Sequence, residues 1–299
     1  CDPDTEITVV PGATEGIFCA VMACVGPGDE VILLDPSYDS YRPSVELAGG
    51  VPVHVPLQNS NFKPDWDRVR EAITPRTRMI MINSPHNPTG ATLGRSDLDT
   101  LAQLAVDYHL LVCSDEVYEH LVYDDHEHLS VLQWPALRER SFAHYSFGKT
   151  FSVTGWKTGY CVAPPALTAE LRKVHQFVAF VAVTPVQQAI AEFLASHPDY
   201  PASLGDFYQA KRDLFCEALG ASRFTIKPSA GTYFQLLDYS AISDTTDEQL
   251  CQDWTRELRV ASIPISVFYQ QPPEQQMLRF CFAKRDEVLL EAAEVLCRI

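Results

Sequence analysis

The chain has 299 residues, of which 46% are hydrophobic and 21% are charged, a composition typical of a soluble globular protein. Its formal net charge of −16 and its isoelectric point near 4.9 argue against nucleic acid or an anionic membrane as a partner. No apolar run reaches membrane-spanning length, so we expect no membrane partner. An anionic ligand would need a local cationic site, because the chain offers no general basic surface.

The nine cysteines are scattered, odd in number and form no CxxC pair. Most of them lie in apolar runs, where a thiol behaves as a small hydrophobe. This pattern favours a reducing compartment, and we expect a cytoplasmic protein. The chain starts at Cys1 without a methionine and soon enters a strand-like run, Ile7–Val10. We therefore also expect that a natural N-terminal segment is missing.

From Ile7 to about Ala163, short apolar runs alternate with segments of helical length. The expected strands are Ile7–Val10, Val31–Leu34, Val51–Val55, Arg78–Ile82, Leu110–Ser114, Phe142–Ser146 and Gly159–Ala163. The expected helices are Glu15–Val25, Tyr38–Leu47, Asp65–Ile73 and Ser96–Tyr108, the last with Ser96 as its N-cap. Several strands are almost wholly apolar, as strands buried on both faces are. The alternation predicts an α/β fold in which helices cover both faces of a mainly parallel seven-stranded sheet.

The pattern changes after Pro164-Pro165. A long helical stretch runs from about residue 167 to 197, with a break near Thr184-Pro185. The expected elements beyond it are the helices Asp206–Leu219, Asp247–Leu258 and Asp286–Arg298 and the strands Gly231–Leu237, Val260–Ile263 and Met277–Phe282. We predict two domains, a larger ligand-binding domain at residues 1–200 and a smaller α+β domain at residues 201–299.

Ligands of open α/β sheets bind at the carboxyl ends of the strands, so the residues that follow each strand are candidates for function. After the first strand, Gly12-Ala13-Thr14 opens a helix, and the free N–H groups of such a turn bind phosphate well. A plain glycine turn with Thr14 as the N-cap is the alternative. Tyr38 follows the second strand and could lie flat on a planar ligand or simply fill space.

Two polar residues follow the fourth and fifth strands. Asn87 stands before a proline that keeps it extended, so its amide can donate to a ligand oxygen; a rigid turn is the alternative. Asp115 ends an apolar run, and a buried carboxylate there needs a partner such as a protonated ring nitrogen. Tyr118 shares its face if the segment is helical, although Asp115 could equally cap the next helix. The tract 124–128 is interpreted as a solvated loop, and no metal is expected.

Lys149 follows the sixth strand, in the string Ser146-Phe147-Gly148-Lys149. Most lysines are solvated surface charges, but a lysine at a strand end among apolar residues can lose its proton and act as a nucleophile. Such a lysine can form a Schiff base with an aldehyde cofactor. Ser146 and Lys157 offer a hydroxyl and a positive charge for a phosphate. The strand ends together therefore predict a site for a phosphorylated aldehyde.

These strings, in this order, resemble those of the class I/II aminotransferases, which are fold-type I enzymes that use pyridoxal 5'-phosphate (PLP). The strings that carry the resemblance are Gly12-Ala13-Thr14, Pro36-Ser37-Tyr38, Asn87-Pro88-Thr89-Gly90, Ser114-Asp115-Glu116-Val117-Tyr118, Ser146-Phe147-Gly148-Lys149, Gly155-Trp156-Lys157 and Arg279-Phe280-Cys281-Phe282. They span essentially the whole chain and look most like those of the methionine and kynurenine/glutamine aminotransferases. The match begins part-way through the family pattern, which supports the expectation of a missing N-terminal segment.

The resemblance implies a role for each residue. Lys149 would hold PLP and carry a proton between the substrate Cα and the cofactor, and Asp115 would pair with the ring nitrogen. Asn87 and Tyr118 would contact the ring oxygen, and Tyr38 would stack on the ring. The phosphate contacts would come from Gly12, Ala13, Thr14, Ser146 and Lys157, and the substrate contacts from Arg279, which grips the α-carboxylate, and Asn87. From the strand pattern alone, Arg279 would be a surface residue.

The implied activity is PLP-dependent transamination of methionine and aromatic amino acids with a 2-oxo acid acceptor, by a ping-pong mechanism. The segment 175–183 is aromatic and aliphatic and has no arginine, which favours apolar donors over acidic ones. That Phe177 and Phe180 are instead core positions of a helix is an equally weighted alternative. The family also implies a homodimer, in which a neighbouring subunit completes the active site.

Two other functions stay open at the level of the sequence. In a carbon–sulfur β-lyase, the same lysine would expel a β-thiolate after deprotonation of Cα. A non-catalytic PLP-binding sensor domain is the other alternative, although no DNA-binding segment is visible. Pyruvate and ammonia from cystathionine, formed without an added oxo acid, would indicate the lyase. Steady turnover of methionine with an oxo acid would exclude a pure sensor.

Overall fold

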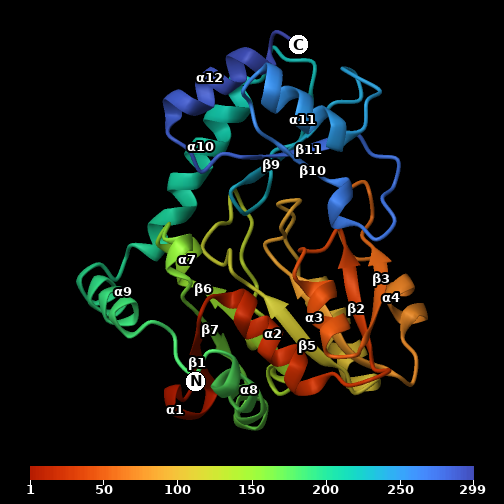
Figure 1. The fold of residues 1–299 in the computed structure, drawn as a ribbon, viewed down its shortest axis with the longest axis vertical. Coiled ribbons are helices and arrows are strands. Elements are labelled where there is room, and N and C mark those ends of the chain that lie inside the picture. Colours follow the sequence, from red (N-terminus) through yellow and green to blue (C-terminus); the bar gives the residue numbers. More distant parts are fainter.

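Seven strands form the larger sheet of the protein, whose computed structural model describes all residues 1–299 (Figure 1). The strand order is β1-β7-β6-β5-β4-β2-β3. The strands are β1 (Ile7–Val10), β2 (Glu30–Asp35), β3 (Val51–Pro56), β4 (Thr77–Asn83), β5 (Leu111–Asp115), β6 (Ser141–Ser146) and β7 (Gly159–Val162). Only β7 runs against its neighbours, and the other pairs are parallel. The predicted sheet is confirmed, with every strand end within one residue of its expected place.

Successive residues of the buried strands pack against opposite layers of helices. In β2, Val31 and Leu33 pack with the helices of one face, whereas Ile32 and Leu34 pack with those of the other. The first face carries α2 (Ala13–Cys24), α3 (Tyr41–Leu47) and α8 (Pro165–Val178), and the second carries α4 (Trp66–Ala72), α5 (Arg95–Asp107) and α6 (Pro135–Arg138). Burial of both faces explains why these strands are apolar runs and not alternating ones.

A second, antiparallel sheet of four strands lies above the first in Figure 1, in the order β10-β11-β9-β8. Its strands are β8 (Thr225–Ile226), β9 (Phe234–Asp238), β10 (Ile263–Pro264) and β11 (Met277–Cys281), with the helices α10 (Leu204–Ala218), α11 (Asp247–Glu257) and α12 (Asp286–Leu296). The predicted smaller α+β part is therefore confirmed. The boundary near residue 200 stays a prediction. No helix of the protein is both long and apolar enough to cross a bilayer.

Some local expectations differ from the structure. Helix α5 has Gly94 and not Ser96 as its N-cap, and the Gly94 N–H donates to the Asp97 carboxylate at 2.8 Å. The long helical stretch is interrupted at residues 179–183, as predicted near Thr184-Pro185, because α9 (Thr184–Ser196) starts with a proline in its first turn. Residues 117–120 form a turn and not a helix, and residues 231–233 precede strand β9.

Several short elements have no signal in the sequence pattern. They are α1 (Pro3–Glu6), α7 (Phe147–Thr150), β8 and the single-turn 3-10 helices Val131–Gln133, Thr154–Trp156, Pro201–Ser203 and Ser266–Phe268. Elements of two to four residues contain too few positions to show a hydrophobic period. Helix α7 matters most, because it follows β6 directly and carries Lys149.

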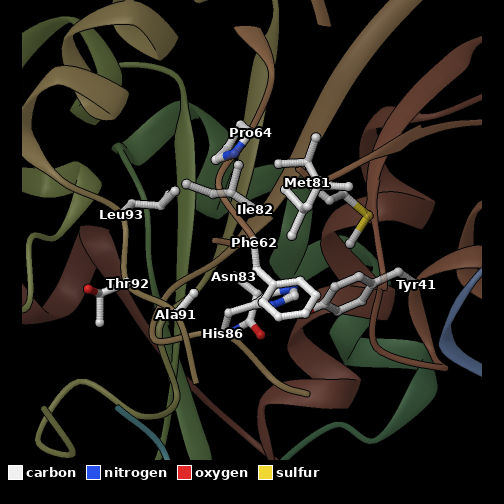
Figure 2. Close-up of a pocket in the computed structure, with 12 residues that line it drawn as sticks. Tyr41, Phe62, Pro64, Met81, Ile82, Asn83, His86, Ala91, Thr92 and Leu93 are labelled. Carbon is white, nitrogen blue, oxygen red and sulfur yellow. The ribbon is translucent and has the colours of Figure 1, made fainter. Parts of the chain in front are cut away.

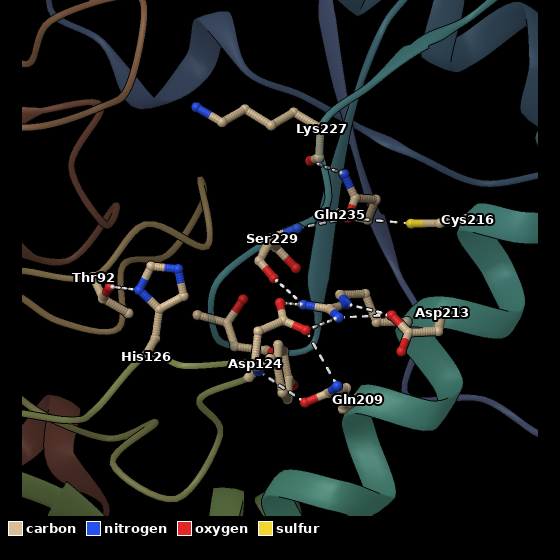
Figure 3. Close-up of polar contacts among 12 residues, drawn as sticks. Thr92, Asp124, His126, Gln209, Asp213, Cys216, Lys227, Ser229 and Gln235 are labelled. Carbon is tan, nitrogen blue, oxygen red and sulfur yellow. Dashed lines mark hydrogen bonds and ion pairs between the residues drawn. The ribbon is translucent and has the colours of Figure 1, made fainter.

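The loop after β5 contacts the segment that precedes β9 of the smaller sheet. The buried side chain of Tyr123 lies in this loop, and its backbone N–H donates to the Ala230 carbonyl at 3.0 Å. The guanidinium of Arg212, on α10, donates to the Asp124 carboxylate and to the Ser229 carbonyl, both at 2.8 Å (Figure 3). These contacts fix the segment before β9 close to the carboxyl end of the larger sheet.

Candidate active site

One cavity lies where the carboxyl ends of β1, β2, β4, β5 and β6 meet. Its lining comprises Gly12, Ala13, Thr14, Tyr38, Asn87, Asp115, Val117, Tyr118, Ser146, Gly148, Lys149, Thr154, Lys157 and Thr158. All ten residues for which the sequence predicts a cofactor contact are among them. The structure thus brings together residues that are up to 145 positions apart, from Gly12 to Lys157.

The N-terminus of α2 forms the cationic end of this cavity. Gly12 is the N-cap and has a φ of +83°, a left-handed conformation that favours glycine. A Cβ on Gly12 would lie only 3.4 Å from the Nζ and Cε atoms of Lys157, so the lysine amine packs directly over this turn. The helix dipole and the Lys157 charge act at one place, next to the free N–H groups of Ala13 and Thr14. An anion such as a phosphate ester suits this corner.

Asp115, at the end of β5, is only 6% exposed. Its Oδ2 accepts a hydrogen bond of 2.5 Å from the Tyr41 hydroxyl, and its Oδ1 accepts one of 3.3 Å from the Val117 N–H. Burial raises the pKa of Asp115 from near 3.8 to about 6, although these hydrogen bonds and the charge of Lys149 act in the opposite direction. A cation beside this carboxylate would favour its charged form.

Tyr41 is a site residue that the sequence did not reveal. Its hydroxyl binds Asp115, and its ring lines a small, mainly apolar cavity of about 20 Å³, together with Met81, Ile82 and His86 among others (Figure 2). That volume suits roughly one water molecule and excludes an organic ligand. Burial lowers the pKa of His86 to about 4, so this wall is neutral. The only signal was a second tyrosine three positions after Tyr38, in a stretch predicted to be helical.

Asn87 connects the cavity to Arg279. The Asn87 N–H donates to the side chain of Asn83 at 2.7 Å, and the Asn83 amide donates to the Asp115 carbonyl at 2.8 Å. The guanidinium of Arg279 on β11 donates to Asn87 Oδ1 at 2.5 Å and lies 4.1 Å from the centre of the Phe234 ring. Arg279 is thus a half-buried residue of the site and not a surface residue. It forms no ion pair within the chain, so its charge is available to an anionic ligand.

Lys149 is held by a residue from the other sheet. Its Nζ donates to the Tyr233 hydroxyl at 2.9 Å and lies about 5.5 Å from the centres of the Tyr118 and Tyr233 rings. Tyr118 is only 2% exposed, and burial raises the pKa of its hydroxyl well above the ordinary value. Tyr233 was missed because the sequence predicts a strand there, which makes an aromatic residue look like part of the core.

Two groups with metal-binding side chains lie outside this cavity. Donor atoms of Glu15, Cys19 and His175 lie within 4.8 Å of one another. Hydrogen bonds already link them, because Glu15 Oε1 lies 2.8 Å from His175 Nδ1 and accepts from the Cys19 thiol at 3.1 Å. In the tract 124–128, predicted to be a solvated loop, residues 124–127 are exposed, whereas His128 binds the buried Glu116 carboxylate at 3.1 Å.

The sequence and the fold both match known aminotransferases. The profile of the family described as aminotransferase class I and II matches residues 1–296. The chain is 47% identical to the methionine aminotransferase of Escherichia coli over 293 residues, which are 98% of this chain and 76% of that protein. It is 35% identical to the kynurenine–oxoglutarate transaminase 3 of Rattus norvegicus over 324 residues, covering 98% of this chain and 71% of that one.

A solved structure gives the same result. The crystal structure of YbdL from Escherichia coli, reported with a methionine aminotransferase function, superimposes with a TM-score of 0.97 at 47% identity. The superposition covers 100% of this chain and 79% of YbdL. The predicted resemblance and the predicted fold are therefore confirmed along the whole chain.

The raised pKa of Asp115 predicts a pH-dependent stability of the cofactor-free protein. Because its pKa is higher in the folded protein than in the unfolded chain, its stabilising effect is complete below about pH 4 and is lost as the pH rises through about 6. A difference of two pKa units corresponds to about 3 kcal/mol. The melting temperature of Asp115→Asn, which never ionises, should therefore rise relative to wild type between about pH 4 and pH 7.

The control for this measurement is Glu71→Gln, which removes a carboxylate from an exposed position. Its melting temperature should follow that of the wild type at every pH. If the gap between Asp115→Asn and the wild type stays constant from acid to neutral pH, the carboxyl does not titrate in that range. The argument that it lies in a site that needs a cation would then lose its support.

Proposed function

The chain belongs to the class I and II aminotransferase family, and we propose that it uses PLP to move the amino group of methionine and aromatic amino acids to a 2-oxo acid. As an aminotransferase it acts on amino acids and 2-oxo acids. One observation carries the finer proposal. Lys149, the buried Asp115 and Lys157 line a single cavity, and Arg279 donates a hydrogen bond to Asn87, which lines the same cavity.

The residues of this cavity fit PLP group by group. Lys157 and the start of α2 would hold the phosphate, together with Ser146. The carboxyl of Asp115, whose pKa is raised by burial, would be stabilised as an anion by a protonated ring nitrogen. Asn87 accepts from Arg279 through its oxygen, which leaves its amide N–H groups to donate to a ring oxygen. Tyr118, which also lines the cavity, would contact the same oxygen, and Tyr38 would cover the ring.

Bound PLP supplies an electron sink for the negative charge that develops at the substrate Cα. The chain supplies the rest. Arg279 binds the α-carboxylate through two parallel N–H groups and so fixes the amino acid in one orientation. The Lys149 amine takes the proton from Cα as a general base and then gives it up as a general acid, so that the proton moves between the substrate Cα and the cofactor. The centres of the aromatic rings of Tyr118 and Tyr233 lie about 5.5 Å from this amine.

The choice of amino donor rests on the relatives and on one segment. The relatives named above act on methionine and kynurenine, and both donors have apolar or aromatic side chains. The segment 175–183 contains no arginine, and none of its residues lines the cavity within this chain. Its phenylalanines, Phe177 and Phe180, are 87% and 74% exposed, so the alternative that they are core residues is wrong for the chain alone.

These exposed residues support a homodimer. Phe177, at the end of α8, and Phe180, Val181 and Val183, between α8 and α9, form an exposed apolar stretch, and such a patch is typical of a protein interface. In a homodimer a second copy would cover it. Light scattering should give twice the chain mass of 33.4 kDa, and a monomer at micromolar concentration would contradict this part of the proposal.

The nine free cysteines support a reducing, cytoplasmic location.

A panel of amino donors tests the proposed function. The protein, loaded with PLP, is mixed with methionine, phenylalanine, tyrosine, kynurenine, glutamine or aspartate and several 2-oxo acids, and the new oxo acid is measured. We expect turnover with methionine and the aromatic donors and at least ten-fold lower kcat/KM with aspartate, because the relatives are methionine and kynurenine aminotransferases and no arginine lines the cavity for a second carboxylate. Aspartate as the best donor would contradict the proposal. Release of pyruvate and ammonia from cystathionine without an oxo acid would indicate a β-lyase.

Arg279→Ala tests the proposed carboxylate site. We expect KM to rise roughly 100-fold for every donor, since a bidentate charged contact contributes about 3 kcal/mol. Bound PLP, measured by absorbance, should stay near one per chain, because Arg279 does not line the cofactor cavity. Arg256→Ala, at an exposed position on α11, is the control and should behave like the wild type. Loss of PLP with unchanged KM would show that Arg279 serves the cofactor instead.

A further inference from the structure

We propose that Tyr233 is a further catalytic residue, whose hydroxyl holds the Lys149 amine in one place while the amine carries the proton to and from the substrate Cα. This inference rests on the proposed function of Lys149 and names an additional group at the reacting atom. It starts from a single contact. The Tyr233 hydroxyl is the only hydrogen-bond partner of the Lys149 amine in the chain, at 2.9 Å.

The position of the Tyr233 ring is fixed by its aromatic neighbours. The ring of Tyr118 stands perpendicular to it at a centre-to-centre distance of 5.2 Å, and that of Phe234 lies at 4.8 Å and is also nearly edge-on. Tyr208 approaches at 6.1 Å from α10. Edge-to-face contacts of this kind stabilise an aromatic cluster beyond simple burial. The hydroxyl is therefore presented to Lys149 by a ring that has little freedom to move.

The backbone around Tyr233 is also fixed. The Thr232 N–H donates to the Leu121 carbonyl at 2.9 Å, and the Tyr233 carbonyl accepts from the Phe282 N–H at 3.0 Å. Thr232 has a φ of +65°, a conformation that a β-branched residue rarely adopts and that surrounding contacts must hold. A few residues upstream, Ser229 is bound by its carbonyl and its N–H to side chains of α10 and β9 (Figure 3).

A hydroxyl is suited to both charge states of the lysine. When the neutral amine takes the Cα proton, the C–H bond breaks, an N–H bond forms, and the electron pair stays on the substrate side. The resulting ammonium donates to the Tyr233 oxygen, whereas the neutral amine can accept the hydroxyl proton through its lone pair or donate to the oxygen. A hydroxyl that can donate or accept stays bonded to Nζ through the whole transfer. A phenylalanine ring would leave the amine free to rotate.

The same segment also contacts the group proposed to bind the substrate. The ring centre of Phe234, the next residue, lies 4.1 Å from the guanidinium carbon of Arg279. Strand β9, which starts at Phe234, pairs with β11, which carries Arg279. Tyr233 and Phe234 thus position the proton carrier and the carboxylate anchor from one short stretch of backbone. Precise positioning of both groups is a large source of rate enhancement in enzymes.

Tyr233→Phe tests the inference, with Tyr208→Phe as the matched control. The Tyr208 hydroxyl contacts Ser152 at 3.2 Å and not Lys149, so the control removes a hydroxyl from the same aromatic cluster. In Tyr233→Phe we expect kcat for methionine to fall about ten-fold, or about 1.4 kcal/mol, with KM changed less than about two-fold. The kinetic isotope effect with Cα-deuterated methionine should increase, because the proton transfer at Lys149 becomes slower. The control should match the wild type.

Two readouts do not depend on turnover. The pH midpoint of the absorbance of bound PLP should change in Tyr233→Phe and stay constant in Tyr208→Phe, because only Tyr233 contacts the lysine nitrogen. The rate at which the methionine Cα proton exchanges with D₂O, measured by NMR without an oxo acid, should fall in parallel with kcat. If kcat, the isotope effect and the midpoint of Tyr233→Phe all equal those of the control, the inference is wrong. If the wild type exchanges the Cα proton but transaminates no donor, the proposed function fails, and the exchange rate still decides the role of Tyr233.

Discussion

Burial of the Asp115 carboxylate at the end of β5 is the constraint on which the other parts of the site depend. A buried carboxylate is stable as an anion only with hydrogen bonds and a nearby cation, and the chain supplies Tyr41 and Val117 but no ion pair. The Asp115 carbonyl accepts in addition from the Asn83 amide and the Ser84 N–H. These bonds link the carboxyl ends of β4 and β5 at Asp115. The Asn83 side chain also binds the Asn87 N–H, and Asn87 in turn binds Arg279.

The site is completed from the second sheet. Lys149 emerges from β6 of the larger sheet, yet its amine is held by Tyr233, just before β9 of the smaller one. Arg279 likewise comes from β11 and reaches Asn87 of the larger sheet. A movement of one sheet relative to the other would separate Tyr233 from the Lys149 amine and Arg279 from Asn87 at the same time. The contacts of Tyr123 and Arg212 with the segment 229–230 oppose such a movement.

The sequence predicted the larger sheet well, because strands buried on both faces are short apolar runs, and turn residues mark their ends. It also predicted ten of the fourteen cavity residues, because residues that follow the strands of such a sheet lie at its ligand-binding edge. It could not show Tyr41 or Tyr233, because both look like ordinary core aromatics in the sequence. Tyr41 lies 74 positions from its partner Asp115, and Tyr233 lies 84 positions from its partner Lys149. The Ser96 cap was wrong because the helix already starts at Arg95, where the Asp97 carboxylate binds the Gly94 N–H. The exposed pair Phe177 and Phe180 has the sequence pattern of a buried pair.

The central claim is that Lys149 is the amine that holds the cofactor in this cavity. The most direct measurement is to incubate the protein with PLP, reduce it with borohydride, digest it and locate the labelled lysine by mass spectrometry. The account predicts a single label, on the peptide that contains Lys149. It predicts none on Lys157, whose amine packs over the turn at Gly12. Labelling of other lysines with Lys149 left unmodified would contradict it.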